Sequence, residues 1–306
     1  MTRPFGYVKK PGSTHPHESG AAKGPPPAGV GAPPVWTRCV GARMRAPRNL
    51  NLWKELRGMD IRFPGGKTKC VTFSYDDGVS QDVELIRILD EHGMKGTFNL
   101  ITQYVGAGPV AFNHLGQDVA FTNVTEAEIP VWYKNHEIAS HGKMHAPYTT
   151  LSPEGLREEV LENVAYLERV SGRKIIGGAY PGGEYSAEVA GRLRGMGLQY
   201  YRTIQDTHGF ALPADFLQWH PTCHDNDEQA RALAERFLAA DGGEPLVFFI
   251  WGHAYEFDKT DRDRWGNFRR LCDRLASRDD IWFATNGELC RWVLGLKGEA
   301  DTPGRI

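Results

Sequence analysis

The stretch CVTFSYDDG, residues 70–78, indicates the fold, because an apolar run typical of a buried strand ends abruptly in two acids and a glycine. In α/β proteins with parallel strands, functional side chains gather where the strands end. Neighbouring residues within a strand point to opposite faces of the sheet. Asp76 and Asp77 can therefore share one site only if the chain turns there, and Gly78 permits such a turn. We expect the chemistry of this protein to begin at these two carboxylates.

Outward from this stretch, apolar strand-like runs alternate with helical stretches. The expected strands are 70–74, 96–100, 137–140, 175–180, 199–203, 246–251 and 281–284. The expected helices are 79–92, 152–170, 186–196, 227–240, 262–277 and 286–296. Such alternation predicts an α/β domain with a parallel sheet, and seven strands suit an incomplete barrel better than an open two-sided sheet.

Composition narrows the possible partners. The chain has 306 residues, is 41% hydrophobic and carries a formal net charge of −2. Charges of both signs are mixed, so we expect neither nucleic acid nor an anionic membrane as a partner. No run approaches the roughly 18 unbroken apolar residues of a membrane span, and no secretory signal is seen, so a cytoplasmic location is expected. Five cysteines without a C-x-x-C pair argue against a disulfide framework and against a cysteine zinc site.

The first 58 residues differ from the rest of the chain. They are rich in Gly, Pro and Arg and show little periodicity. Such a segment cannot bury enough apolar surface to offset its ordering entropy. We expect 1–58 to be a disordered tail, with a translation start assigned too early as the alternative, and 59–306 to be a single domain.

Two histidines four residues apart, His141 and His145, can turn their rings toward one point. Two histidines and one carboxylate are a frequent catalytic zinc set that leaves a fourth position for water. The residue after His141 is not Glu, so this is not the H-E-x-x-H motif. The base that takes a proton from water must come from elsewhere, and either Asp76 or Asp77 can supply it.

Two further segments resemble parts of a hydrolytic site. The run FFIWGH, residues 248–253, ends a strand in His253, which would suit a general acid for a leaving amine; the alternative is a capped strand with a partly buried histidine. The run YPGG, residues 180–183, could direct a backbone N–H at a developing oxyanion, although alone it is only a turn.

Together, these four elements resemble the polysaccharide deacetylase family, the NodB-homology or carbohydrate esterase family 4 group. The family motif T-F-D-D-G is matched by residues 72–78 with two extra residues inside, and its H-S/T-x-x-H motif is matched in the histidines. The final L-x-H motif is similar to residues 251–253. The resemblance covers about 60 to 295 and implies a distorted (β/α)7 barrel.

The resemblance also implies a role for each matched residue. One divalent metal, zinc first and cobalt, nickel or manganese otherwise, would be bound by Asp77, His141 and His145. Asp76 would be the general base and His253 the general acid. Trp251 would shape the acetyl pocket, and the N–H of Gly182 would complete the oxyanion hole.

The comparison with the family pattern leaves several differences and open assignments. Ala179 stands where the family has an Arg that orients the base, and we expect Arg202 to take that place. Gly142 replaces the usual Ser or Thr, so the histidine loop must be held by something else. The aspartate that tunes the acid histidine would be Asp206. The segment 219–225 has no counterpart and would line a substrate groove or form a rigid loop.

The implied activity is removal of N-acetyl groups from an amino-sugar oligo- or polysaccharide, with carbohydrate as the partner. Aromatic residues after predicted strands could stack on sugars, or else pack in the core: Tyr148, Tyr180, Trp219, Tyr255 and Phe257. Two alternatives stay open. One is a metal-dependent amidohydrolase acting on a non-sugar amide or cyclic imide, and the other is an idle carbohydrate-binding module.

Overall fold

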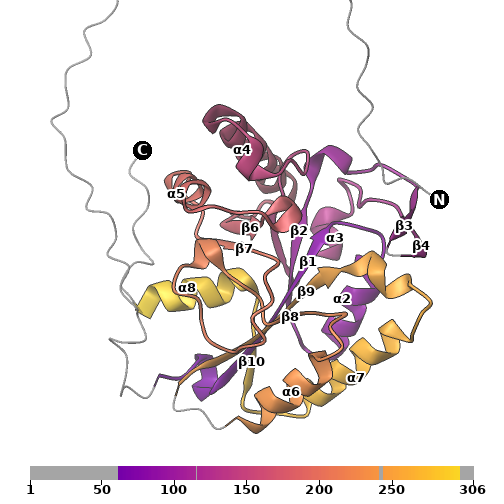
Figure 1. Ribbon diagram of the computed structural model, residues 1–306, viewed down its shortest axis with the longest axis vertical. Helices are drawn as coiled ribbons and strands as arrows, with labels where there is room; N and C mark the ends of the chain where they lie inside the picture. Colours follow the sequence, from indigo (N-terminus) through magenta and orange to yellow (C-terminus); the bar gives the residue numbers. More distant parts are fainter. Residues whose placement is uncertain (1–60, 115, 241–243, 297–306) are drawn as a thin grey trace, which may run out of the picture. The chain divides into compact units, whose positions relative to one another are not determined.

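The structure is a computed structural model that describes residues 61–114, 116–240 and 244–296 (Figure 1). The predicted tail, 1–58, lies outside the described residues. The centre of the described part is one sheet of parallel strands in the order β7-β6-β5-β2-β1-β9-β8, with β10 beside β1. Its members are β1 (Lys69–Asp77), β2 (Gly96–Leu100), β5 (Glu137–Ser140), β6 (Gly177–Ala179), β7 (Tyr200–Arg202), β8 (Cys223–His224), β9 (Leu246–His253) and β10 (Ile281–Phe283).

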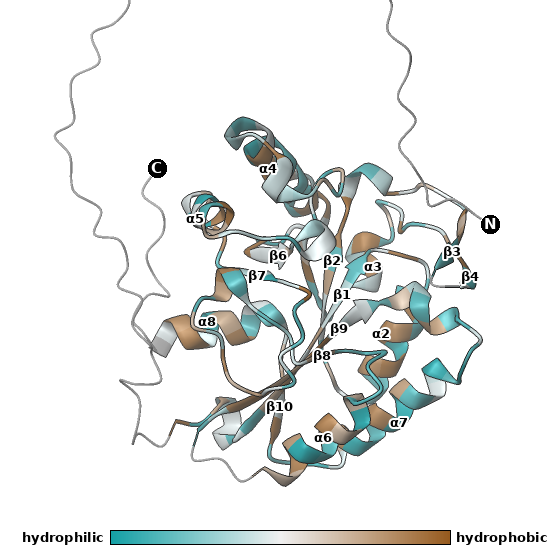
Figure 2. Cartoon of the chain, in the orientation of Figure 1, coloured by the Kyte–Doolittle hydropathy of each residue, from teal (hydrophilic) through white to brown (hydrophobic). Residues whose placement is uncertain are grey.

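Helices follow most of the strands (Figure 1). They are α2 (Asp82–Glu91), α3 (Ile129–Trp132), α4 (Pro153–Ser171), α5 (Ala187–Gly195), α6 (Ala230–Ala239), α7 (Arg264–Ala276) and α8 (Asn286–Leu296). Helices α2 to α7 share one hydrophobic core with the sheet, whereas α8 packs with Cys70, Tyr200 and Val247 in a second one. Figure 2 shows that α2, α6 and α7 each combine apolar and hydrophilic residues, as expected of helices with one face in the core. Among the described helices, none is both long and apolar enough to cross a membrane.

The segment 219–224 closes the sheet on itself. The N–H of Trp219 donates to the carbonyl of Tyr201 in β7, at 3.0 Å. Three residues later, the N–H of Thr222 donates to the carbonyl of Phe249 in β9, at 2.8 Å. The segment therefore bridges β7 and β9, and the circuit β1, β2, β5, β6, β7, β8, β9 forms the predicted distorted (β/α)7 barrel.

The predicted barrel is confirmed, but the choice of its seventh strand was wrong. The strand expected at 281–284 is β10, which pairs only with Lys69, Cys70 and Val71 at the start of β1. On the same side, β2 pairs with the remainder of β1, from Phe73 to Asp77. The true closing strand, β8, was read as a loop because it is two residues long and lies in a polar sequence.

One hairpin was not predicted. Strands β3 (Val110–His114) and β4 (Gln117–Phe121) form an antiparallel pair. In the sequence they lie between β2 and α3. The rings of Phe112 and Phe121 contact Tyr255, with centroids 5.7 and 5.3 Å away. The hairpin therefore packs on the segment that follows β9 and belongs to the surroundings of the site.

Four cysteines, Cys70, Cys223, Cys272 and Cys290, are buried and form no disulfide in the described part of the chain. The fifth, Cys39, lies outside the described residues.

Candidate metal centre and catalytic site

The turn predicted after β1 begins at Asp77 itself. Asp77 has φ +80° and Gly78 has φ +72°. A Cβ atom on Gly78 would lie 2.7 Å from the side chain of Leu100, so this position needs glycine. The turn brings both carboxylates to one imidazole: Nε2 of His141 lies 3.8 Å from Asp76 Oδ2 and 3.7 Å from Asp77 Oδ1.

Three possible metal ligands converge at this point. One donor atom from each of Asp77, His141 and His145 lies within 4.8 Å of the others. Asp77 and His145, with φ +80° and +62°, are two of the three non-glycine residues at positive φ in the described chain. Such a backbone costs about 1–3 kcal/mol per residue and is found mainly at functional sites. The donor set and its backbone therefore fit a divalent cation.

Backbone contact fixes the ring of His141. Its Nδ1 lies 2.9 Å from the carbonyl of Ala179, which leaves Nε2 facing the aspartates. Burial lowers the pKa of His141, and this effect outweighs the attraction of Asp76. The imidazole is therefore held neutral, as a metal ligand must be.

Arg202 binds Asp76, at the place expected for the missing arginine. Its guanidinium forms a buried ion pair with Asp76 Oδ2, and its Nε donates to Ser74 Oγ at 3.2 Å. Asn99 donates to the other oxygen of Asp76 at 2.9 Å. Burial alone would raise the pKa of Asp76, but Arg202 and the nearby histidines hold it well below its usual range. Asp76 is therefore a carboxylate at neutral pH.

His253 faces the same carboxylate from β9. Its Nε2 lies 3.9 Å from Asp76 Oδ2, and its Nδ1 lies 3.2 Å from Glu256 Oε1. Burial would lower the pKa of His253, but Glu256, Asp77 and Asp76 together raise it to about 9. The imidazole therefore carries a proton at neutral pH.

Glu256 is a site residue that the sequence analysis missed. It is buried in a 3-10 helix, η6 (Ala254–Asp258), three residues after His253, and this spacing was the available signal. Its second oxygen accepts a hydrogen bond from Asn226 and lies 3.5 Å from Lys259 Nζ. Asp206, expected beside the acid histidine, instead accepts hydrogen bonds from Trp251 Nε1 and from the backbone of His224.

Helix α4 holds the loop between the two histidines. Glu159 Oε1 accepts hydrogen bonds from the N–H groups of Met144 and Ala146, at 2.7 and 3.2 Å. Asn163, one turn later, donates to the carbonyl of Gly142 at 2.6 Å. Gly142 has φ +79°, and a Cβ there would lie 2.6 Å from Glu159 Oε1. Glycine at this position therefore makes room for Glu159, which holds the loop in the absence of the usual Ser or Thr.

Two more predicted residues border the same region. The guanidinium carbon of Arg202 lies 4.6 Å from the ring centroid of Trp251. Gly182 lies in the turn Pro181–Gly183 with φ +66°, next to Pro181, which faces Gly142 of the histidine loop.

The predicted aromatic faces for sugars are not available. All five side chains are buried, with exposed fractions of 7% or less: Tyr148, Tyr180, Trp219, Tyr255 and Phe257. The hydroxyl of Tyr180 donates to the carbonyl of Leu217 at 2.6 Å. Core packing, the alternative for each residue, is what the structure shows.

Part of this sequence matches a known protein family. Residues 64–201 match the sequence model of the polysaccharide deacetylase family. This segment belongs to the polysaccharide deacetylase family. The match includes Asp76 and the three candidate ligands and ends before Arg202 and His253. A search of curated proteins found no match by sequence.

The chain also resembles solved structures at low sequence identity. A polysaccharide deacetylase candidate from Mycobacterium smegmatis is 20% identical, with a TM-score of 0.54 over 81% of this chain and 97% of that one. A family 4 acetyl xylan esterase from Clostridium thermocellum, solved with a cobalt ion, is 18% identical, with a TM-score of 0.46 over 75% and 92%. At 20% identity, the first comparison supports the fold and nothing finer.

Proposed function

We propose that this protein is a metal-dependent hydrolase that removes N-acetyl groups from an amino-sugar oligo- or polysaccharide. The observation that carries the proposal is the convergence, at one end of the barrel, of three metal donors, an ionised aspartate and a protonated histidine. Binding alone would need none of these protonation states. This disfavours an idle carbohydrate-binding module.

Asp77, His141 and His145 would hold the cation, zinc first, with cobalt, nickel or manganese as ions that accept similar ligands. A divalent cation held there would lower the pKa of water and polarise the amide carbonyl. The chain provides the ligand set in a restrained form, because His141 is fixed by Ala179 and the His145 loop by Glu159.

The remaining residues divide the proton transfers. Asp76, kept ionised by Arg202, takes a proton from the attacking water. His253, kept protonated by Glu256, donates a proton to the departing amine. The N–H of Gly182 would bind the developing oxyanion, and Trp251 would shape the acetyl pocket. The products are acetate and a free amino sugar.

Acetate release from N-acetylated glycan oligomers tests this proposal. Chelation should abolish release and a divalent cation should restore it. Asp76→Asn should retain the cation and lose on the order of 100-fold or more in rate, as expected for a lost general base. His145→Ala should lose cation and activity together. If Asp76→Asn loses the cation instead, the roles of the two aspartates are exchanged.

A second candidate is a hydrolase of the same fold that acts on a non-sugar amide or a cyclic imide. The burial of all five expected aromatic residues favours it, because none offers a ring to a sugar. Met144 and Ile204, next to His145 and near Arg202 in sequence, are instead exposed apolar side chains. A panel of simple amides and cyclic imides, assayed beside the glycans with the same Asp76→Asn control, distinguishes the two substrates.

A further inference from the structure

Asp82 is a buried acid that the proposed reaction does not use. It is the first residue of α2, shortly after the turn at Asp77 and Gly78, and its side chain is fully buried. A buried carboxyl group costs free energy unless hydrogen bonds compensate for the lost water. The partners of Asp82 therefore indicate what it does.

One oxygen of Asp82 accepts two hydrogen bonds. The N–H of Val79 donates to Asp82 Oδ2 at 3.2 Å, and the hydroxyl of Tyr133 donates to the same oxygen at 2.6 Å. In return, the N–H of Asp82 donates to the carbonyl of Val79 at 2.9 Å. Asp82 therefore ties the start of α2 to the residue that follows the turn.

The N–H of Val79 belongs to the peptide group that directly follows this turn. The carbonyl of the same peptide group, on Gly78, accepts a hydrogen bond from the N–H of Val124 at 2.9 Å. The peptide group is therefore held at both ends, by Val124 at its carbonyl and by Asp82 at its N–H. Asp77 has a positive φ, and such a backbone persists only where its surroundings enforce it.

Tyr133 holds Asp82 from the other side. It follows α3, is fully buried, and its ring centroid lies 4.8 Å from that of Phe98 in β2. Its carbonyl accepts a hydrogen bond from Arg173 at 2.9 Å. The hydroxyl that binds Asp82 is therefore fixed by the core and not by the turn itself.

The charge of Asp82 suits a structural contact. Burial raises the pKa of Asp82 to about 8, although the hydrogen bonds from Tyr133 and Val79 act in the opposite direction. The carboxyl group is therefore mostly uncharged at pH 7. An amide of the same shape can accept the same two hydrogen bonds.

We propose that Asp82 is a positioning residue for the candidate metal centre. It fixes the turn at Asp77 and Gly78 through its hydrogen bonds with Val79 and Tyr133, and so presents the Asp77 carboxylate to the cation. This inference rests on the proposed function, because it requires that Asp77 binds a cation.

Calorimetric titration of the full-length protein with zinc tests the role of Asp82 without an assay of activity. Asp82→Leu keeps the volume of the side chain but accepts no hydrogen bond. It should weaken zinc binding by about tenfold or more, as expected when a partner that orients a metal ligand is lost. Asp82→Asn keeps the acceptor and should bind zinc as tightly as wild type.

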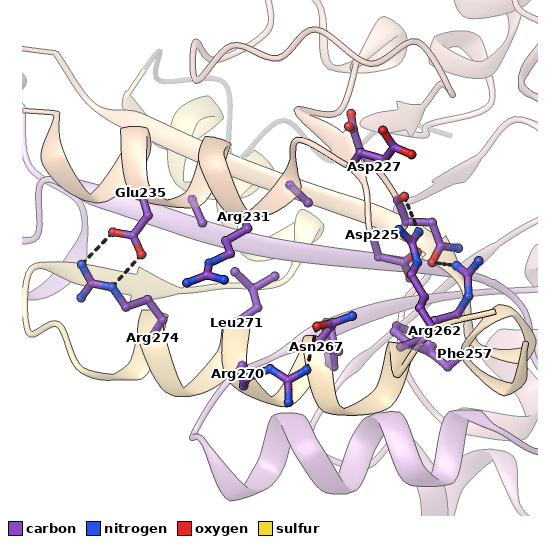
Figure 3. Close-up of a pocket in the computed structure, with 16 residues that line it drawn as sticks. Asp225, Asp227, Arg231, Glu235, Phe257, Arg262, Asn267, Arg270, Leu271 and Arg274 are labelled. Carbon is purple, nitrogen blue, oxygen red and sulfur yellow. Dashed lines mark hydrogen bonds and ion pairs between the residues drawn. The ribbon is translucent and has the colours of Figure 1, made fainter. Parts of the chain in front are cut away.

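Leu275→Ala is the matched control for lost stability. Leu275 is fully buried on α7, and none of the three candidate ligands lines the cavity beside α7 in Figure 3. Denaturant unfolding should show that Leu275→Ala is destabilised, while its zinc affinity stays at the wild-type value. Tyr133→Phe removes one of the two hydrogen bonds to Asp82 and should weaken zinc binding less than Asp82→Leu; it replaces Asp82→Leu if that variant does not fold.

Two results would overturn the role of Asp82: wild-type zinc affinity in Asp82→Leu and Tyr133→Phe, or an equal loss in Asp82→Leu and Asp82→Asn. Failure of the proposed function has a different readout. Wild-type protein would then bind no zinc, or its zinc binding would survive His145→Ala, and the inference on Asp82 would fall with the cation site.

Discussion

Asp76 and Asp77 are neighbours in sequence with opposite surroundings. The side chain of Asp76 is 3% exposed and bound by Arg202, whereas that of Asp77 is 18% exposed and lies beside the two histidines. The sequence indicated the pair but left open which carboxylate would be the base. Which of the two aspartates is buried in an ion pair depends on Arg202, which is 126 residues away from Asp76. No local sequence pattern encodes that contact.

Arg202→Met should destabilise the fold by about 3–5 kcal/mol, because it leaves the buried Asp76 carboxylate without its counter-charge. The double variant with Asp76→Asn should regain most of that loss. Chemical unfolding at pH 7 with a chelator present measures both. If the double variant is no more stable than Arg202→Met, the cost comes from packing rather than from charge.

The same pair predicts a pH dependence. The pKa of Asp76 is lower in the folded than in the unfolded state, so its stabilisation is present above the unfolded value, about 4, and is lost as the pH falls. Unfolding free energies measured in acid, with chelator, should therefore fall less steeply for Asp76→Asn than for wild type. Parallel curves would contradict the lowered pKa.

Glu256→Gln should move the alkaline limb of the rate profile to lower pH. Burial lowers the pKa of His253, and Glu256 is the largest influence that raises it. The resulting pKa is about 9. Activity that needs protonated His253 is lost as the pH rises through this value. Rate profiles at saturating cation give the shift. An unchanged alkaline limb would exclude His253 as the group that titrates there.

At the scale of elements, periodicity predicted α4 well but not its function. Ser152 caps the helix by accepting a hydrogen bond from Gly155, and Pro153 occupies its first turn, as the sequence indicates. Glu159 and Asn163, however, are polar residues on its buried face. Their partners are backbone groups of a loop, and sequence patterns of side chains give no information on such bonds.

Glu159→Ala should lower cation affinity by about 10–100-fold, the usual effect of losing a partner that orients metal ligands. The two N–H groups it binds, on Met144 and Ala146, flank His145. Calorimetric titration with zinc measures the change, and Glu154→Ala, an exposed acid of the same helix, is the control. Equal affinities for both variants would show that the His145 loop keeps its conformation without Glu159.

At the scale of the molecule, the strand and helix pattern was enough to predict a parallel barrel, yet not how it closes. Strands such as 96–100 and 137–140 were predicted with their observed bounds, because each is a distinct run between helical stretches. The closing segment has no such run. Its strand character comes from hydrogen bonds offered by β7 and β9, which meet it only after the sheet has curled.

Trp219→Ala tests this closure. Trp219 is buried between Phe216 and Phe249, with ring centroids 4.8 and 4.6 Å away, so its loss should cost about 3–5 kcal/mol. Trp132→Ala, on the short helix α3 and only partly buried, should cost less. Denaturant unfolding compares them. Similar losses would mean that 219–224 contributes no special stability.

Because β8 is only two residues long, few backbone pairs join β7 to β9 through the segment 219–224. We call this junction the seam of the barrel. The ladder of β8 with β9 spans two residue pairs, and a single bridge links Trp219 to β7, whereas β1 and β9 share eight pairs. The seam runs past His224 and Asn226, which border Glu256 behind the acid histidine. Transient opening of the bonds along this seam would therefore disturb proton donation by His253 before it disturbed the cation ligands. The backbone amides of 219–224 should be the first in the barrel to exchange with solvent deuterium.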